Sequence, residues 1–347
     1  MAKRSLIELS AAEKHDEKRK KKSLKKKNIS SSSSYTFLEP ASYFCSCGRK
    51  IHPQNLSLPF LPAVPPLAAR LISEYLEADI GYGDISGSLF SKCRGEGIII
   101  AKENGVISGV EFALYVFYLL GLQATAYYHS GDEIHKGSTV IKVEGSVPCI
   151  LAGERTALNI LMRMSGIATY TSRLLKTARK KNPNIIVAST RKTTPGFSFF
   201  EKRAVRDGGG DTHRLRLDDM AMLKDNHIAA AGSIRKAVAL LRKHLSFSRK
   251  IEVEAQDKEM AFEAADAGAD IVMLDNFTPE ETEAAYKTLK ARFPAIFVEV
   301  SGGINEKNIA DYAEHADIIS AGSITHSYKS LDLSLEIIGK NLSLKDV

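Results

Sequence analysis

Short apolar runs alternate with longer amphipathic stretches throughout the second half of the chain. Six short apolar runs between residues 185 and 321 have the length of buried strands, namely IIVAST, MAMLK, IEVEA, DIVMLD, IFVEVS and DIISA. Segments of helical period separate the later runs. Repeated strand–helix units require parallel strands, which form either a barrel or a doubly wound sheet.

Polar residues recur where these apolar runs end: Arg191, Lys224, Glu254, Asp275, Ser301 and Ser320. In a (β/α) barrel the carboxyl ends of the strands form the face that carries the active site. No glycine-rich dinucleotide fingerprint follows the first run, which argues against a dinucleotide fold. We therefore predict an α/β protein with an incomplete (β/α) barrel, since only six strands are evident.

The preceding segment has a different pattern, which predicts an N-terminal α+β sandwich domain. LAARLISEYLEADIG predicts a helix that ends at Gly81, and EFALYVFYLLGL predicts a buried helix. GIIIAKENGVISGV is typical of a hairpin-like pair of strands, and short strands with glycine turns follow. We interpret His129 and His135 in those turns as exposed loop residues. The stretch after Gly153 predicts a long helix, in which Gly166 could form a break.

The first 65 residues have a biased composition. KRKKKSLKKK, SSSSS and LPFLPAVPP predict a disordered extension. Residues 1–28 hold 11 Lys/Arg and 4 Asp/Glu, which leaves 37 residues of each sign in the rest, so the globular part has no nucleic-acid footprint. No apolar segment of a secretory signal follows the lysines, and the interspersed acids disfavour a transit peptide. We favour a solvated extension, or upstream sequence that is not translated. The alternative is a nuclear tail or one that binds RNA or an anionic surface.

The predicted organisation is a disordered basic, Ser- and Pro-rich extension over 1–65, the N-terminal α+β domain over 66–165, the barrel catalytic domain over 166–325 and a C-terminal helical segment over 326–347. The longest apolar run, 112–122, is too short to span a bilayer. Four cysteines form no disulfide framework, which predicts a reducing, cytoplasmic environment. Cys45 and Cys47 lack a second pair with zinc-ligand spacing.

The stretch from Thr190 to His227 concentrates positive charge between turn-forming glycines. Its cationic side chains are Arg191, Lys192, His213, Arg214, Lys224 and His227. Cations placed at turn edges suit a small polyanion such as a dicarboxylate. Structural ion pairs with Asp218, Asp219 and Asp225 are the alternative, and composition alone does not decide between them.

Four motifs in this order resemble those of the quinolinate phosphoribosyltransferase family, the carboxylating nicotinate-nucleotide pyrophosphorylases: GERTALN, TRKT-PG, GGG-x-x-HR and LKDNH. The resemblance covers residues from about 67 to 340. It implies a barrel of about seven strands and the transfer of phosphoribose from phosphoribosyl pyrophosphate (PRPP) to quinolinate. The products would be nicotinate mononucleotide, pyrophosphate and CO₂, in de novo NAD biosynthesis.

The resemblance also implies roles for individual residues. Those implied to bind quinolinate are Arg155, Arg191, His213, Arg214 and Lys224. Those implied to bind PRPP are Lys192, Glu254, Asp275, Ser301, Gly302, Gly303, Gly322, Ser323 and His326. The implied catalytic set is Lys192, Lys224, Glu254 and Asp275. Carboxylates at strand ends can hold Mg²⁺, so Glu254 and Asp275 are expected to bind it, directly or indirectly. Glu252 is interpreted as a member of a deeper core ion pair.

In the family the arginine at the position of Arg155 reaches the substrate of a neighbouring subunit. We therefore expect a homodimer with shared active sites, or a hexamer built from it, and neither a membrane nor a nucleic-acid partner. The sequence departs from the family pattern at Arg216, Ser198 and Arg203, which bears on substrate preference. A transferase acting on another ring, such as the molybdenum-operon paralogue, is the nearest rival. An anion- or RNA-binding protein is a more distant one.

Overall fold

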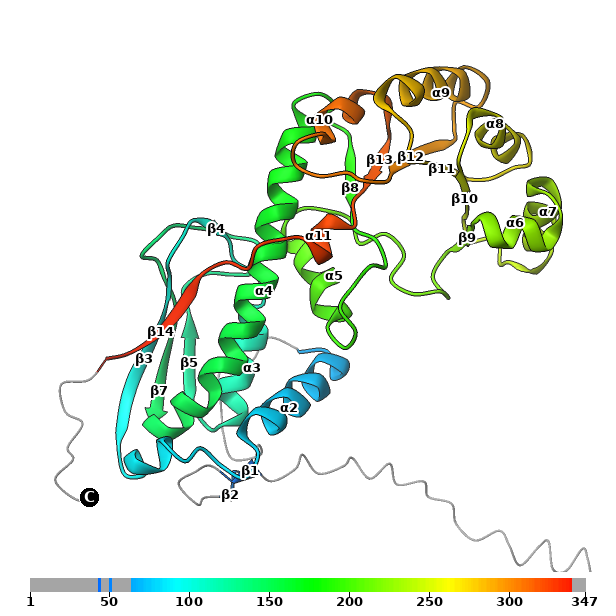
Figure 1. Cartoon of the computed structure of the whole chain (residues 1–347). Coiled ribbons are helices and arrows are strands. Elements are labelled where there is room, and N and C mark those ends of the chain that lie inside the picture. The colour runs from blue at the N-terminus through cyan, green and yellow to red at the C-terminus, as the bar shows by residue number, and fades with distance from the viewer. Residues whose placement is uncertain (1–42, 45–49, 52–63, 339–347) are drawn as a thin grey trace, which may run out of the picture. The chain divides into compact units, whose positions relative to one another are not determined.

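The computed structural model describes residues 43–44, 50–51 and 64–338 (Figure 1). The extension predicted over 1–65 lies almost entirely outside the described residues, as does the chain beyond residue 338. Two short strands, β1 (Tyr43–Phe44) and β2 (Lys50–Ile51), pair in antiparallel fashion.

An antiparallel sheet of four strands forms the N-terminal part, in the order β14-β3-β7-β5. The strands are β3 (Arg94–Ala101), β5 (Gln123–Ala126), β7 (Thr139–Ser146) and β14 (Leu333–Ile338). Helix α2 (Pro66–Ile80) ends at Gly81, which has a φ of 55°, as predicted. Helix α3 (Val110–Leu119) is the predicted buried helix. His129 and His135 are exposed, in agreement with the sequence interpretation.

Two predictions about this sheet are wrong. Strand β3 does not form a hairpin with β4 (Gly105–Val106); it pairs with β7 and β14, while β4 pairs with β6 (Glu133–Ile134). The C-terminal segment is not helical over Leu333–Ile338, because β14 adds to the free edge of β3. The alternation in LSLEII suits such an edge strand, whose side chains point to the two faces in turn.

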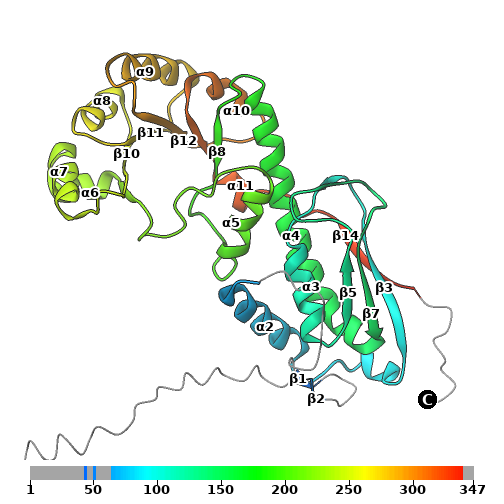
Figure 2. The same cartoon turned by 180° about the vertical axis from the view of Figure 1, so that it is seen from behind.

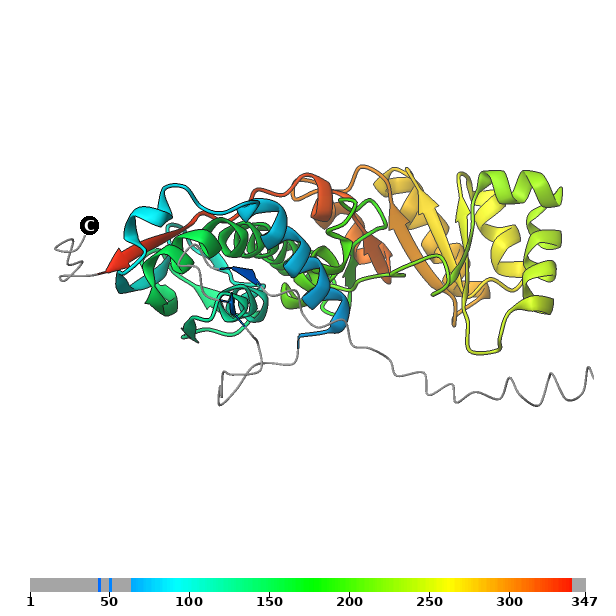
Figure 3. The same ribbon diagram turned by 90° about the horizontal axis from the view of Figure 1, so that it is seen from below.

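Helix α4 (Val147–Arg179) is continuous, so the break considered at Gly166 does not occur. A Cβ atom at Gly166 would lie 2.4 Å from the carbonyl oxygen of Lys329. The glycine therefore allows the returning chain to pass close to the helix. Helix α4 packs against β7 of the antiparallel sheet and β8 of the parallel sheet, as Figures 1, 2 and 3 show. It thus runs through the boundary predicted at 165/166, and the proposed domain division stays a prediction.

A parallel sheet of six strands forms the C-terminal part, in the order β8-β13-β12-β11-β10-β9. Its strands are β8 (Ile186–Ala188), β9 (Ala221–Leu223), β10 (Ile251–Ala255), β11 (Ile271–Asp275), β12 (Phe297–Ser301) and β13 (Ile318–Ser320). Its helices are α5 (Ser198–Asp207), α6 (Asp225–Ala231), α7 (Ile234–His244), α8 (Lys258–Asp266), α9 (Pro279–Arg292), α10 (Ile309–Tyr312) and α11 (Ser323–His326). Because β8 and β9 do not pair with each other, the barrel is open between them. The predicted fold class is confirmed, but the described part of the barrel has the six strands evident in the sequence rather than the seven or so that the family resemblance implied.

The helical period of apolar residues explains how α7, α8 and α9 pack on the parallel sheet. Helix α7 buries Ile234, Ala237 and Val238 and exposes its charged side, and α8 and α9 likewise bury one stripe. Among the helices that the structure describes, none is long and apolar enough to cross a membrane. Cys93 is a free thiol but Cys149 is disulfide-bonded, so the prediction of unpaired cysteines is wrong at Cys149.

Candidate functional site

A pocket of about 490 Å³ lies at the carboxyl ends of the parallel strands. Eleven residues singled out from the sequence line it: Arg191, Lys192, His213, Arg214, Lys224, Glu254, Asp275, Ser301, Gly302, Gly303 and Ser320. Its volume is that of a small-molecule site, and its wall is unusually rich in charge. The structure therefore brings most of the predicted site residues together.

Strand register explains why these side chains meet. Asp275 pairs with Ser301 across β11 and β12, and Ser301 pairs with Ser320 across β12 and β13. Glu254 pairs with Met273 one position deeper. The last residues of neighbouring strands therefore form one rim, as a parallel barrel requires.

The cations of the pocket do not form ion pairs with Asp218, Asp219 or Asp225, the acids nearest in the sequence that were considered as partners. Asp218 lies 3.3 Å from Arg216, and Asp219 lies 3.5 Å from Arg249. Asp225 accepts a hydrogen bond from the amide of Asn226. The cationic side chains therefore face the pocket rather than these three aspartates.

Two cations of this set have distinct surroundings. Lys224 forms an ion pair with Glu254 inside the pocket. The Arg214 guanidinium contacts the carbonyl oxygen of Met220 at 3.4 Å and the sulfur of Met222 at 3.2 Å. Burial, reinforced by the nearby charge of Arg191, lowers the pKa of Arg214. His227 lies outside the pocket lining, and its Nδ1 accepts the backbone N–H of Lys224 at 3.1 Å.

Two loops of small residues complete the rim. Gly302 has a φ of 103°, and a Cβ atom there would lie 2.3 Å from Asn276 Oδ1. The Ser323 hydroxyl donates to the carbonyl oxygen of Ile304 at 2.9 Å, which ties the two loops together. Backbone amides can therefore approach a bound anion closely here.

Gly322, Ser323 and His326 do not line the main pocket. His326 and Lys192 line an adjoining hollow of about 550 Å³. A Cβ atom at Gly322 would lie 2.9 Å from His326 Nε2 and 3.1 Å from Lys192 Cδ, so these side chains converge there. Lys192 borders both cavities and links them.

Arg155 lies outside the pocket of its own chain. Its side chain is 66% exposed on α4, and it pairs with the adjacent Glu154 at 3.1 Å. Of the predicted quinolinate ligands, it is the one that the fold of a single chain does not bring to the site.

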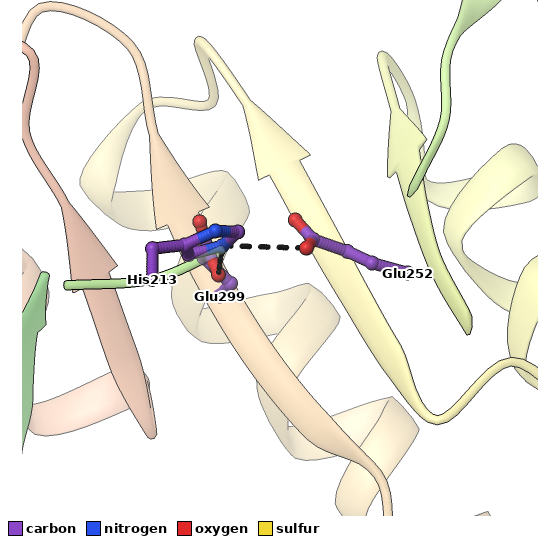
Figure 4. A group of neighbouring side chains, drawn as sticks. All are labelled: His213, Glu252 and Glu299. Atoms are coloured by element: carbon purple, nitrogen blue, oxygen red, sulfur yellow. Dashed lines mark hydrogen bonds and ion pairs between the residues drawn. The ribbon is translucent and has the colours of Figure 1, made fainter. Parts of the chain in front are cut away.

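His213, Glu252 and Glu299 form a trio of neighbouring side chains, drawn in Figure 4, of which His213 and Glu299 also line the pocket. His213 Nε2 donates to Glu299 Oε2 at 3.1 Å and lies 3.3 Å from Glu252 Oε2. Both glutamates are fully buried. Glu252 therefore lies in the deeper core, as interpreted, within ion-pair distance of His213. The sequence analysis missed Glu299, although an acid within the apolar run IFVEVS was a usable signal.

The trio has the spacing of a metal site, but its hydrogen bonds indicate that Nε2 of His213 carries a hydrogen instead of binding a metal. The ligand atoms of His213, Glu252 and Glu299 lie within 4.8 Å of one another. However, His213 Nδ1 accepts the backbone N–H of Arg214 at 2.8 Å. A ring that accepts at Nδ1 carries its hydrogen on Nε2, which leaves no lone pair there for a metal.

A second missed residue, Lys202, lies beneath the cationic wall. It is 4% exposed, and its ammonium group donates to Ser189 Oγ at 3.0 Å and to the carbonyl oxygen of Thr212. Burial lowers its pKa to about 8. In the sequence, nothing distinguished Lys202 from the exposed polar positions of an amphipathic helix.

The departures from the family pattern lie in different places. Arg203 does not line the pocket; it pairs with Glu111 at 3.2 Å and Asp207 at 2.9 Å and so joins α5 to α3. Arg216 and Ser198 line a hollow that also includes Arg191. The first departure is therefore structural, and the other two border the pocket mouth.

Comparison with known proteins agrees with this geometry. Residues 84–165 match the family profile described as "Quinolinate phosphoribosyl transferase, N-terminal domain", and residues 167–336 match the corresponding C-terminal domain. A curated relative from Methanocaldococcus jannaschii, "Probable nicotinate-nucleotide pyrophosphorylase [carboxylating]", is 44% identical over 279 residues, which are 78% of this chain and 97% of the relative. The nicotinate-nucleotide pyrophosphorylase [carboxylating] of Homo sapiens is 38% identical over 81% of this chain and 95% of its own length.

Solved structures give the same result. The nicotinate-nucleotide pyrophosphorylase from Francisella tularensis superposes with a TM-score of 0.74 at 35% identity, covering 80% of this chain and 99% of its own. The family and enzyme class predicted from the sequence are thereby confirmed. The chain belongs to the quinolinate phosphoribosyltransferase family.

Proposed function

We propose that this chain transfers phosphoribose from PRPP to the ring nitrogen of quinolinate, a step of NAD biosynthesis. The bond from C1 of the ribose to pyrophosphate breaks, and a bond from C1 to the ring nitrogen forms. The carboxylate at C2 of the ring then leaves as CO₂, and C2 takes up a proton. The observation that carries the proposal is the pocket itself, in which a cationic wall faces a pair of carboxylates and two small-residue loops.

Quinolinate has two adjacent carboxylates, which require charge-assisted donors in a partly desolvated site. Arg191, Arg214 and Lys224 line the pocket and supply three such charges. We assign the two carboxylates to them and the protonation of C2 to Lys224. His213 belongs to the same wall, but its ring nitrogens are bonded within the chain.

Glu254 and Asp275 are the residues that would hold Mg²⁺. Mg²⁺ is usually bound through one or two carboxylates together with substrate phosphates. Glu254 lines the pocket with Lys224 on one oxygen, and Asp275 Oδ2 accepts from the Asn276 amide at 2.8 Å. The remaining carboxylate oxygens fit this donor set. When bound, the ion would neutralise charge on the pyrophosphate leaving group.

The small-residue loops are assigned to the phosphates of PRPP. Gly302 and Gly303 present backbone at the rim, and the hydrogen bond from Ser323 to Ile304 holds the second loop beside the first. Lys192 borders both cavities, so we assign it with His326 to pyrophosphate. No protein nucleophile is required, because positioning and electrostatics carry such a transfer.

We also propose a homodimer, or a hexamer of such dimers, in which Arg155 completes the site of the neighbouring subunit. Its exposure and its position outside the lining of its own pocket support this arrangement. We further propose a cytoplasmic location, since a phosphorylated co-substrate such as PRPP is retained there by its charge.

A coupled assay tests the reaction. Purified protein should consume quinolinate only when PRPP and Mg²⁺ are present, and it should release one CO₂ per nucleotide formed. Nicotinate is the matched control, because it has the same ring without the carboxylate that leaves. Equal turnover of nicotinate would contradict the proposal, as would transfer without release of CO₂.

A further inference from the structure

Lys202 on α5 is a buried cation that the described residues do not pair with a carboxylate. Its ammonium group donates to Ser189 Oγ at 3.0 Å and to the carbonyl oxygen of Thr212, and both of these acceptors are neutral. Burying an ammonium ion that has only neutral partners costs free energy. The stability of the fold therefore does not account for a lysine at this position, which lies beside a pocket.

Two acids act on Lys202 only from a distance. Burial lowers the pKa of Lys202 to about 8, although the charges of Asp211 and Glu201 raise it. These carboxylates are bonded elsewhere: Asp211 Oδ1 accepts the N–H of His213 at 2.6 Å, and Glu201 Oε2 accepts the N–H of Thr194 at 2.9 Å. At pH 7 the ammonium group therefore carries a charge that no direct ion pair offsets within the described part of the chain.

The two acceptors of Lys202 lie where two segments of the chain meet. Ser189 directly follows β8, and its hydroxyl donates to the carbonyl oxygen of Thr212 at 3.2 Å. Each segment carries a cation of the pocket two residues further on, Arg191 after Ser189 and Arg214 after Thr212. Lys202 therefore joins the two segments at the point from which both cations extend.

Helix α5 gives Lys202 a rigid base. The neighbouring side chains of Phe200 and Val205 are fully buried, and α5 packs against the long helix α4. A donor on a packed helix fixes the loops that it holds more firmly than one loop can fix another. Lys202 itself does not line the pocket, so its effect on a ligand there must pass through the two segments.

We propose that Lys202 is a positioning residue that sets the spacing between Arg191 and Arg214 for a ligand with two adjacent carboxylates. The proposal rests on the proposed binding of quinolinate by these two arginines. Without the ammonium group, the hydroxyl of Ser189 alone would join the two segments, and the separation of the arginines would vary. The pocket should then lose its preference for adjacent carboxylates.

Two dicarboxylates of equal charge test the spacing. Phthalate has two adjacent carboxylates on its ring, as quinolinate has, but it lacks the ring nitrogen that reacts. Isophthalate has its carboxylates one ring position further apart. The wild-type protein should bind phthalate more tightly than isophthalate. Lys202→Met, which keeps the length of the side chain, should lower this preference, the ratio of the two Kd values, about fivefold or more.

The ratio separates positioning from charge. Loss of a positive charge beneath the pocket weakens both dicarboxylates alike and leaves the ratio unchanged. An unchanged ratio in Lys202→Met would therefore overturn the proposal, whether or not both Kd values rise. Calorimetric titration of the full-length protein measures the Kd values. Arg206→Met removes an exposed cation from the same helix and should keep the ratio within about twofold of the wild-type value.

Thermal unfolding of each variant checks the fold. If Lys202→Met does not fold, Ser189→Ala decides the matter, because it removes one acceptor of the ammonium group and keeps the lysine. It should lower the preference for phthalate about threefold, and an unchanged ratio would overturn the proposal.

The outcomes also separate this proposal from the assigned roles of the arginines. If the wild-type protein binds the two dicarboxylates equally, or if Arg191→Gln and Arg214→Gln leave phthalate binding unchanged, the quinolinate assignment fails, and the positioning role fails with it. If both arginine variants weaken phthalate binding but Lys202→Met leaves the ratio unchanged, the positioning role alone fails.

Discussion

Lys224 and Glu254 form an ion pair inside the pocket, from adjacent strands β9 and β10. Lys224 directly follows β9, and Glu254 lies on β10. The proposed roles place Lys224 with quinolinate and Glu254 with the magnesium complex of PRPP. The pair therefore couples the two substrate sites, because a charge change on either side chain alters the field at the other.

Removing the lysine should harm the site in two ways. Lys224→Met loses a donor to quinolinate and leaves Glu254 unpaired beside the incoming carboxylates. We expect kcat/KM for quinolinate to fall at least about 100-fold, or about 2.7 kcal/mol of transition-state stabilisation. Calorimetric titration of quinolinate should show partial recovery of binding in Lys224→Met/Glu254→Gln, which lacks the repulsive charge. No recovery would mean that Glu254 does not face the quinolinate carboxylates.

How much the sequence could predict depends on how local each signal is. Asp275 and Ser301 were predicted at the site because each ends an apolar run, and the ends of parallel strands converge. Strand β14 was missed because its partner β3 lies more than two hundred residues earlier in the chain. Glu299 was missed because its apolar run masks a polar contact that depends on His213, a residue of a distant loop.

The loop after β12 should be sensitive to a single methyl group. Gly302→Ala would bring Cβ to within 2.3 Å of Asn276 Oδ1 at a φ of 103°. Gly303 has a φ of 62° but no atom within 4 Å of such a Cβ, so Gly303→Ala is a matched control for backbone strain alone. We expect Gly302→Ala to raise the KM for PRPP by about tenfold or more and Gly303→Ala by clearly less. Equal changes would argue against close approach of the Gly302 backbone to the phosphate.

Lys202 should give the stability of the protein a distinct dependence on pH. Burial lowers its pKa from 10.5 to about 8 in the folded chain. Between these values the unfolded chain binds one proton more, so the free energy of unfolding should rise with pH, by at most about 1.4 kcal/mol per unit. Below pH 8 the full cost of the buried charge is present, and above pH 10.5 it is gone.

Urea unfolding of Lys202→Met at pH 8 and pH 10 measures this contribution. The variant should lose the rise with pH that the wild-type protein shows. Lys180→Met, at the exposed end of α4, should keep it. Identical pH dependence in Lys202→Met and the wild type would show that Lys202 stays charged in the folded chain.

Arg203 should matter for stability rather than for catalysis. Its guanidinium bonds Asp207, which is nearly buried and also accepts from Ser108 at 2.6 Å. Arg203→Ala leaves Asp207 and Glu111 without their cation and should cost about 1–3 kcal/mol of unfolding free energy. Arg206→Ala on the same helix is the control, because Arg206 forms no ion pair with any described residue. A changed KM for quinolinate in Arg203→Ala would instead give this departure a part in substrate preference.

The shared site can be tested by complementation. Arg155 is exposed on α4 and does not line its own pocket, whereas Glu254 does. Arg155→Ala and Glu254→Ala should each be nearly inactive. In a mixed dimer with two-fold symmetry, one site receives both lesions and the other receives neither.

Co-expression of the two variants should therefore restore activity. Random pairing of equal amounts makes about half of the dimers mixed, so about a quarter of wild-type activity should return. A hexamer built from the same dimers gives the same fraction, and two affinity tags verify that mixed dimers have formed. If Arg155 served its own barrel, every site would keep one lesion and mixing would restore nothing. Activity that stays at the level of the single variants, with mixed dimers present, would therefore exclude Arg155 as a ligand supplied by the neighbouring subunit.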